Sequence, residues 1–156
     1  MARVDFAFGA PDRLRTACLV TRKRYLAGQT VLAYSADAQR LAAFDRLLWA
    51  FDPVSFVPHV GVDDPLATDT PVVLSMAAPG AWLGRLPDGV ALPWLLNLDD
   101  GCPPDAGRFE RIMEIVASGD ADRQLARSRW REYAAAGHDV HAHDLRSPAG
   151  PARGDA

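Results

Sequence analysis

Short segments of strand character alternate with longer helical segments along this chain, and this order constrains its fold more than any other feature. Residues 3–8 alternate between apolar and polar side chains, as in a half-buried strand, and residues 11–28 have the spacing of an amphipathic helix. Residues 30–34 and 70–76 are compact runs typical of buried strands. Because parallel strands need crossover connections, we expect an open, mainly parallel sheet with helices on both faces, a three-layer α/β/α architecture.

The remaining segments continue this order. A helix is expected over 35–48, with Ser35 as its N-cap, and another over 120–136. The apolar side chains over 109–116 recur at helical spacing, so a further helix is predicted there, joined to the next near residue 118. Extended segments are expected over 56–60, 92–98 and 138–145, and a loop over 77–89.

One domain is predicted over residues 1–145, because hydrophobic residues are spread along the chain and its length suits a single core. Residues 146–156 are rich in Pro, Gly and Ala and are expected to form a flexible tail. Cys18 and Cys102 form no CxxC motif and are expected to stay reduced. Without an apolar run of membrane-spanning length or a secretory signal, the chain is predicted to be cytoplasmic with no membrane partner.

The formal net charge of −3 argues against broad electrostatic capture of nucleic acid, which needs a concentrated surface of Lys and Arg. We therefore expect DNA to be reached only indirectly, through partners. One alternative is direct binding of single-stranded DNA by the basic face of the helix between Arg13 and Arg24. This alternative ranks lowest because no interleaved aromatic platform accompanies those charges in the sequence.

Three motifs that would give this architecture a catalytic or nucleotide-binding role are absent from the sequence. The turn over residues 8–12 reads FGAPD, with one glycine where a dinucleotide-binding loop has G-x-G-x-x-G. Neither a Walker A lysine motif nor a G-x-S-x-G elbow occurs. We expect no enzymatic activity and no cofactor.

The strongest metal-binding or enzymatic alternative is a histidine cluster near the end of the chain. His141 and His143 would project from the same face of a strand and could share a divalent ion, but no third ligand of defined spacing is near. An exposed polar edge strand is the favoured interpretation. His59, close to Asp63 and Asp64, resembles an acid/base site, and we expect it to be structural.

Three stretches of the sequence, taken together, resemble the chi subunit family of bacterial DNA polymerase III. They are VDF at 4–6, LWAF at 48–51 with SFVPH at 55–59, and DRQLARSRWREY at 122–133. Their order and separation make the resemblance specific, and it runs from residue 2 to about 145.

The resemblance implies a Rossmann-like fold that is not an enzyme and that has two docking functions. One is to hold the acidic C-terminal tail of single-stranded DNA-binding protein. The other is attachment to the psi subunit of the clamp-loader assembly. Together they would link the protein coat of the template to the polymerase.

The physical case for a tail site rests on the helix predicted over 120–136. Arg123, Arg127, Trp130 and Arg131 are spaced to share one helical face, so cations flank an aromatic surface. Guanidinium groups can bind carboxylates bidentately while an apolar pocket, walled by Val116, accepts a terminal aromatic side chain. From the residues alone, a solvated basic face with Trp130 in the core is equally consistent, and the resemblance favours the tail site.

By the same resemblance, Trp49 and Phe56 match positions tied to the psi contact. A Trp at the end of a helix and a Phe in the following extended segment could form an apolar anchor. Ordinary core filling is the open alternative, because both residue types are usually buried.

Overall fold

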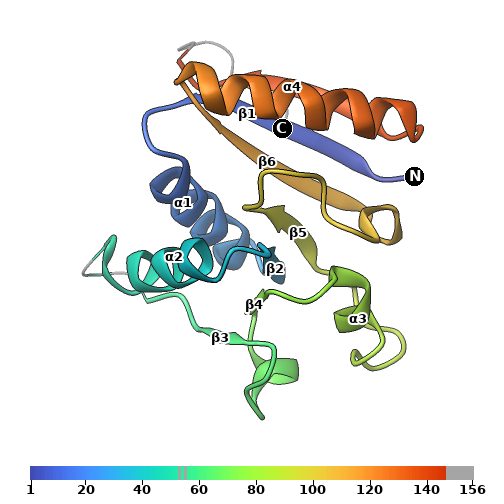
Figure 1. The fold of residues 1–156 in the computed structure, drawn as a ribbon. Coiled ribbons are helices and arrows are strands. Elements are labelled where there is room, and N and C mark those ends of the chain that lie inside the picture. The colour runs from blue at the N-terminus through green and yellow to red at the C-terminus, as the bar shows by residue number, and fades with distance from the viewer. Residues whose placement is uncertain (53, 55, 147–156) are drawn as a thin grey trace.

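The computed structural model describes residues 1–52, 54 and 56–146 and arranges them around one open seven-stranded sheet (Figure 1). All its strand pairs are parallel, in the order β3-β4-β2-β5-β6-β1-β7. The predicted α/β class and parallel open sheet are confirmed. The strands are β1 (Arg3–Ala10), β2 (Val31–Tyr34), β3 (His59–Gly61), β4 (Val72–Ser75), β5 (Trp94–Asn97), β6 (Arg111–Ala117) and β7 (Asp139–Asp144).

Helices cover both faces of the sheet and complete the predicted three layers. On one face α1 (Arg13–Leu26) and α2 (Ala38–Ala50) contribute to one hydrophobic core. On the other face α4 (Asp120–Ala135) and the short α3 (Pro79–Leu83) contribute to a second core (Figure 1). The sheet therefore separates two cores within a single domain.

Because side chains alternate along each strand, one strand contributes different residues to both cores. In β6, Met113 and Ile115 pack on the side of α1 and α2, whereas Ile112 and Val116 pack on the side of α4. In β1, Phe6 likewise belongs to the α4 side. Neighbouring residues of one strand can therefore serve two separate surfaces.

The prediction of a helix over 109–116 is wrong, because this segment forms strand β6 between β5 and β1. A central strand covered on both faces shows a continuous apolar run, and its spacing there matches a helical stripe by coincidence. Ile112, Ile115 and Val116 are β-branched, which favours the strand. Val116 consequently comes from a strand and not from a helix preceding α4.

Two other local predictions are wrong. The segment 77–89, predicted as a loop, contains α3, which has Pro79 in its first turn and a buried Trp82 as its anchor. Asp37, and not Ser35, caps α2, because its carboxylate accepts hydrogen bonds from two backbone N–H groups of the first turn. Ser35 is buried under the loop that follows β5.

Helix α1 only partly follows the predicted amphipathic pattern. Two leucines of the apolar spacing do not face the core, because Leu26 is 73% exposed and Leu19 is also exposed. Arg13, predicted on the basic exposed face, is largely buried. Its Nε donates to the carbonyl of Ile115 at 3.0 Å and its Nη2 to that of Asp99 at 2.9 Å. The guanidinium group thus satisfies two backbone carbonyls just beyond the point where β5 and β6 stop pairing.

Cys18 and Cys102 are free thiols, as predicted. Burial raises the pKa of both thiols to about 12, which keeps them protonated and unreactive near neutral pH. Among the helices described, none has both the length and the apolar character needed to cross a bilayer. Of the tail predicted over 146–156, residues 147–156 lie outside the described part of the chain.

Candidate functional site

Helix α4 presents one face to the core and another to a cavity beside it. Gly119 is its N-cap, and Asp120 and Asp122 occupy the first turn, where the helix dipole favours negative charge. The buried face consists of Ala126, Arg129 and Tyr133. The side chains predicted to bind the tail lie on an adjacent face, so burying the first set orients the second.

A buried polar network fixes α4 on β6. Arg129 Nε donates to Glu114 Oε1 at 3.0 Å, and Tyr133 and Asn97 each donate to Glu114 Oε2 at 2.7 Å. Glu114 is fully buried and Arg129 is 3% exposed. Burial raises the pKa of Glu114, and the three donors oppose that rise by stabilising the ionised carboxylate. Every member has a partner, so the network holds the helix in one orientation.

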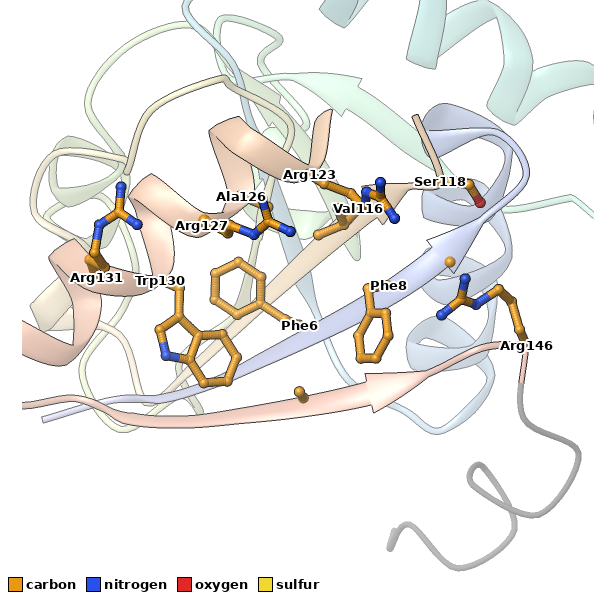
Figure 2. Close-up of a pocket in the computed structure, with 12 residues that line it drawn as sticks. Phe6, Phe8, Val116, Ser118, Arg123, Ala126, Arg127, Trp130, Arg131 and Arg146 are labelled. Carbon is orange, nitrogen blue, oxygen red and sulfur yellow. The ribbon is translucent and has the colours of Figure 1, made fainter. Parts of the chain in front are cut away.

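A cavity of about 510 Å³, here named the α4 pocket, opens between α4 and strands β1, β6 and β7 (Figure 2). Phe6 and Phe8 of β1 line its apolar part together with Val116 of β6. Trp130 of α4 packs against Phe6 with ring centroids 5.1 Å apart. The indole is half-buried, so it contacts the core and also faces the pocket.

Three arginines of α4 line the same pocket, and Figure 2 shows them in a row along the helix. Arg123 pairs with Asp120, and both of these side chains are exposed. Within residues 1–52, 54 and 56–146, the guanidinium groups of Arg127 and Arg131 form no hydrogen bond or ion pair. Both groups therefore offer free donors for a bound carboxylate.

A fourth cation, Arg146, follows β7 and reaches the pocket from the side opposite α4 (Figure 2). Its guanidinium carbon lies 5.7 Å from the ring centroid of Phe8, and its Nε lies 3.1 Å from Asp144 Oδ1. Sequence reasoning missed Phe6, Phe8 and Arg146 as parts of this site. The alternation over 3–8 puts both Phe side chains on one face, but it does not say which helix covers that face.

The five residues predicted to bind the tail all line this one pocket. They are Val116, Arg123, Arg127, Trp130 and Arg131. The pocket combines an apolar interior with cations along one wall, an arrangement suited to a ligand with an apolar end and several carboxylates. The predicted binding role stays a prediction, and the geometry it requires is present.

A second surface lies at the end of α2, next to the edge strand β3. Trp49 and Phe56 are 56% and 59% exposed and their ring centroids are 5.1 Å apart, so they do not fill the core. We name this surface the Trp49–Phe56 patch. Buried His59 contacts Trp49 with centroids 4.8 Å apart. The Nδ1 of His59 lies 2.7 Å from the carbonyl of Val57, and its Nε2 lies 2.8 Å from Asp45 Oδ1. These contacts fix the imidazole ring against which Trp49 packs.

The histidines of β7 face the same side of the strand but have other partners. His141 Nε2 lies 2.9 Å from Asp139 Oδ2, and His143 Nε2 lies 2.8 Å from Asp5 Oδ1. Over the described ranges, no three or more side chains of His, Cys, Asp or Glu are grouped to hold a metal ion. The metal alternative therefore gains no third ligand from the fold.

Comparison with known proteins identifies the family. The family model described as DNA polymerase III chi subunit, HolC, matches residues 1–141. The chain belongs to this chi family. A relative from Pseudomonas aeruginosa, DNA polymerase III subunit chi, is 30% identical over 149 residues, which are 93% of this chain and 98% of the relative. The Escherichia coli protein of the same name is 27% identical over 124 residues, 80% of each chain.

Membership of the chi family confirms the resemblance over nearly the whole chain. In this chi-family chain the late motif forms α4 and one wall of the α4 pocket, and the central motif contributes the Trp49–Phe56 patch. The late and central motifs thus contribute to two separate surfaces of the same domain, the α4 pocket and the Trp49–Phe56 patch.

Proposed function

We propose that this chi-family chain is a non-catalytic accessory subunit of the DNA polymerase III clamp-loader assembly, acting in the cytoplasm without a cofactor. The α4 pocket binds the acidic C-terminal tail of single-stranded DNA-binding protein. The Trp49–Phe56 patch attaches the chain to the psi subunit. The observation that carries the tail site is that all five predicted residues line one cavity.

The apolar part of the pocket suits the end of a peptide. Its volume of about 510 Å³ lies in the range of about 300–1,000 Å³ typical of ligand pockets. Phe6, Phe8 and Trp130 offer ring faces and edges to an aromatic side chain, which prefers offset or edge-to-face contacts. A terminal aromatic residue would therefore be held by burial, without a polar group left unpaired.

The cations select the acidic part of the tail. Arg127 and Arg131 lie one turn apart on α4 and have no ion-pair partner within the described residues, so binding a carboxylate would cost no existing ion pair. Both are exposed, so their attraction for a peptide is screened by salt. Tail affinity is thus expected to fall as ionic strength rises.

Titration of a synthetic acidic tail peptide, followed by calorimetry, tests the proposal. The double variant Arg127→Ala, Trp130→Ala removes one free cation and one ring of the pocket. We expect its affinity to fall at least about tenfold, since a hydrogen bond to a charged group contributes about 1.5–3 kcal/mol.

Arg46→Ala, Trp49→Ala is the matched control, because it changes an exposed Arg and a Trp at the same spacing on α2, far from the α4 pocket. This control should bind the peptide as the parent protein does. Equal affinities of both double variants and the parent protein would remove the basis of the tail site.

A further inference from the structure

A second cavity lies on the opposite face of the sheet, behind the α4 pocket. It has a volume of about 450 Å³ and is bordered by α1 and by strands β1, β5, β6 and β7. Asp5, Ala7 and Ile115 line it, whereas their chain neighbours Phe6, Phe8 and Val116 line the α4 pocket. Because successive side chains of a strand point to opposite faces, two strands serve both cavities back to back.

Positive charge is concentrated around this second cavity, here named the basic cleft. Four cationic side chains border it: Arg3, Lys23, Arg24 and Arg111. Asp5 is shared between two of them, at 3.1 Å from Arg3 and 3.3 Å from Arg111. Lys23 is exposed, and Arg24 bonds only the neutral side chain of Gln29, at 3.1 Å, among the described residues. The cations thus outnumber the carboxylate that compensates them.

The two other carboxyl residues that border the cleft do not neutralise it. Glu114 directs its carboxylate to Arg129 and Tyr133 on the α4 side of the sheet. Asp144 pairs with Arg146, which borders the α4 pocket. The excess of positive charge in the cleft therefore remains after every described ion pair is counted.

Trp94 lines the cleft, and two cations lie over its ring. The guanidinium carbons of Arg24 and Arg111 are 4.6 and 4.2 Å from its ring centroid. Both guanidinium groups thus lie against one indole, and desolvation together with the like charge of Arg111 lowers the pKa of Arg24. A bound anion would relieve this repulsion, and guanidinium groups stacked on an indole form a planar surface on which a nucleic-acid base can stack.

We propose that the basic cleft binds the phosphodiester backbone of a short single-stranded nucleic-acid segment. Arginine and lysine side chains recognise phosphates, and the Arg24–Trp94–Arg111 stack accepts a flat base, which an acidic peptide does not offer. The net charge of −3 argues against broad capture of nucleic acid. It does not exclude a local cleft that contacts one or two nucleotides.

This site goes beyond the proposed function. In the sequence, no interleaved aromatic platform accompanies the charges of the basic helix. The fold brings Trp94 of β5 against Arg24 of α1, so the aromatic residue comes from a distant segment. Since the two cavities lie on opposite faces, a nucleic-acid strand and an acidic tail can be bound together.

Fluorescence anisotropy of a labelled oligothymidylate at low salt tests the cleft. The variant Lys23→Glu, Arg24→Glu should weaken binding roughly tenfold or more and reduce the slope of log affinity against log salt by about 0.7 per lost phosphate contact. Lys23→Glu alone, on an exposed side chain, should have the same effect in smaller measure. Arg15→Glu, Arg46→Glu makes the same change of net charge at exposed positions outside the cleft and should bind almost normally.

Three results would overturn the cleft proposal. The first is the absence of oligothymidylate binding by the parent protein at low salt. The second is an equal loss of affinity in both double variants, which would indicate only long-range charge. The third is cleft-dependent binding of a polyglutamate peptide in place of the oligothymidylate. Since tail titration is a separate measurement without DNA, failure of the tail site and failure of the cleft are distinguishable.

Discussion

At the scale of single residues, the orientation of the candidate site depends on a buried ion pair, Glu114 and Arg129, that does not line the α4 pocket. Glu114 and Arg129 are both inaccessible and are joined at 3.0 Å. An ion pair of this kind contributes little net stability when intact, but loss of one partner leaves a buried charge without compensation. Its role here is positional, because it sets which face of α4 meets the pocket.

Removal of one partner should therefore be costly. We expect Glu114→Ala to lower the free energy of unfolding by about 3–5 kcal/mol, because Arg129 would remain buried without its carboxylate. Urea unfolding measures this change. Arg123→Ala breaks the exposed pair with Asp120 and should cost less than about 1 kcal/mol. Similar losses in both variants would contradict the positional role of the buried pair.

The carboxyl group of Asp5 should make the free energy of unfolding depend on pH. Burial alone would raise the pKa of Asp5, but hydrogen bonds from Arg3 and His143 and the charges of Arg3 and Arg111 outweigh it and lower the pKa below 3.8. A carboxyl with a lowered folded-state pKa stabilises the fold fully above its unfolded pKa, and this stabilisation is lost as pH falls through the folded value.

Asp5→Asn tests this dependence. The variant should be less stable than the parent protein above pH 3.8, and the difference in unfolding free energy should shrink as the pH is lowered further. Denaturant unfolding at a series of pH values measures it. A difference that stays constant through this range would show that the charge of Asp5 does not stabilise the fold.

At the scale of elements, the sequence predicts the segments whose pattern or length fits only one kind of element. Helix α4 and strands β1 and β7 follow their periodic patterns closely, and the buried strands β2 and β4 are recognisable as short, compact apolar runs. Strand β6 is not predicted, because burial on both faces removes the alternation that marks a strand and the spacing of its longer apolar run also fits a helix. Residues of α4 that share a face were found from the 3.6-residue period, whereas Phe6, Trp94 and Arg146 joined their sites only through tertiary packing.

The exposed aromatic side chains at and after the end of α2 allow a test of psi binding. Trp49 and Phe56 are exposed aromatics, so their removal should cost little stability but much affinity if the patch docks the psi subunit. We expect Trp49→Ala, Phe56→Ala to reduce binding to purified psi by about 2 kcal/mol or more, measured by calorimetry. Leu26→Ala changes another exposed apolar residue, on α1, and should leave binding unchanged. Unaltered psi affinity in the patch variant would exclude this surface.

At the scale of the whole molecule, the two proposed docking surfaces lie at opposite ends of the strand order. Strand β3 forms one edge of the sheet, and β1 with α4 lies toward the other (Figure 1). The Trp49–Phe56 patch adjoins β3, and the α4 pocket adjoins β1 and β7. Among the residues that the structure describes, none lines both surfaces, so we expect no coupling free energy between them. The chain would then act as a rigid link that holds two partners at once.

Independence of the two surfaces can be measured directly. The affinity of the tail peptide should be the same for the chain alone and for its complex with saturating psi, as judged by calorimetry. A change in tail affinity on adding psi would show that the surfaces overlap or that the sheet transmits a conformational change.

NMR chemical-shift mapping of the chain with the acidic tail peptide tests most directly whether the α4 pocket receives that tail. We expect the largest amide shifts at the residues of β1 and α4 that line the pocket, which are Phe6, Phe8, Gly9, Ala126, Arg127, Trp130 and Arg131. Shifts centred on the Trp49–Phe56 patch or on Trp94 in the basic cleft, with the α4 pocket unperturbed, would contradict it.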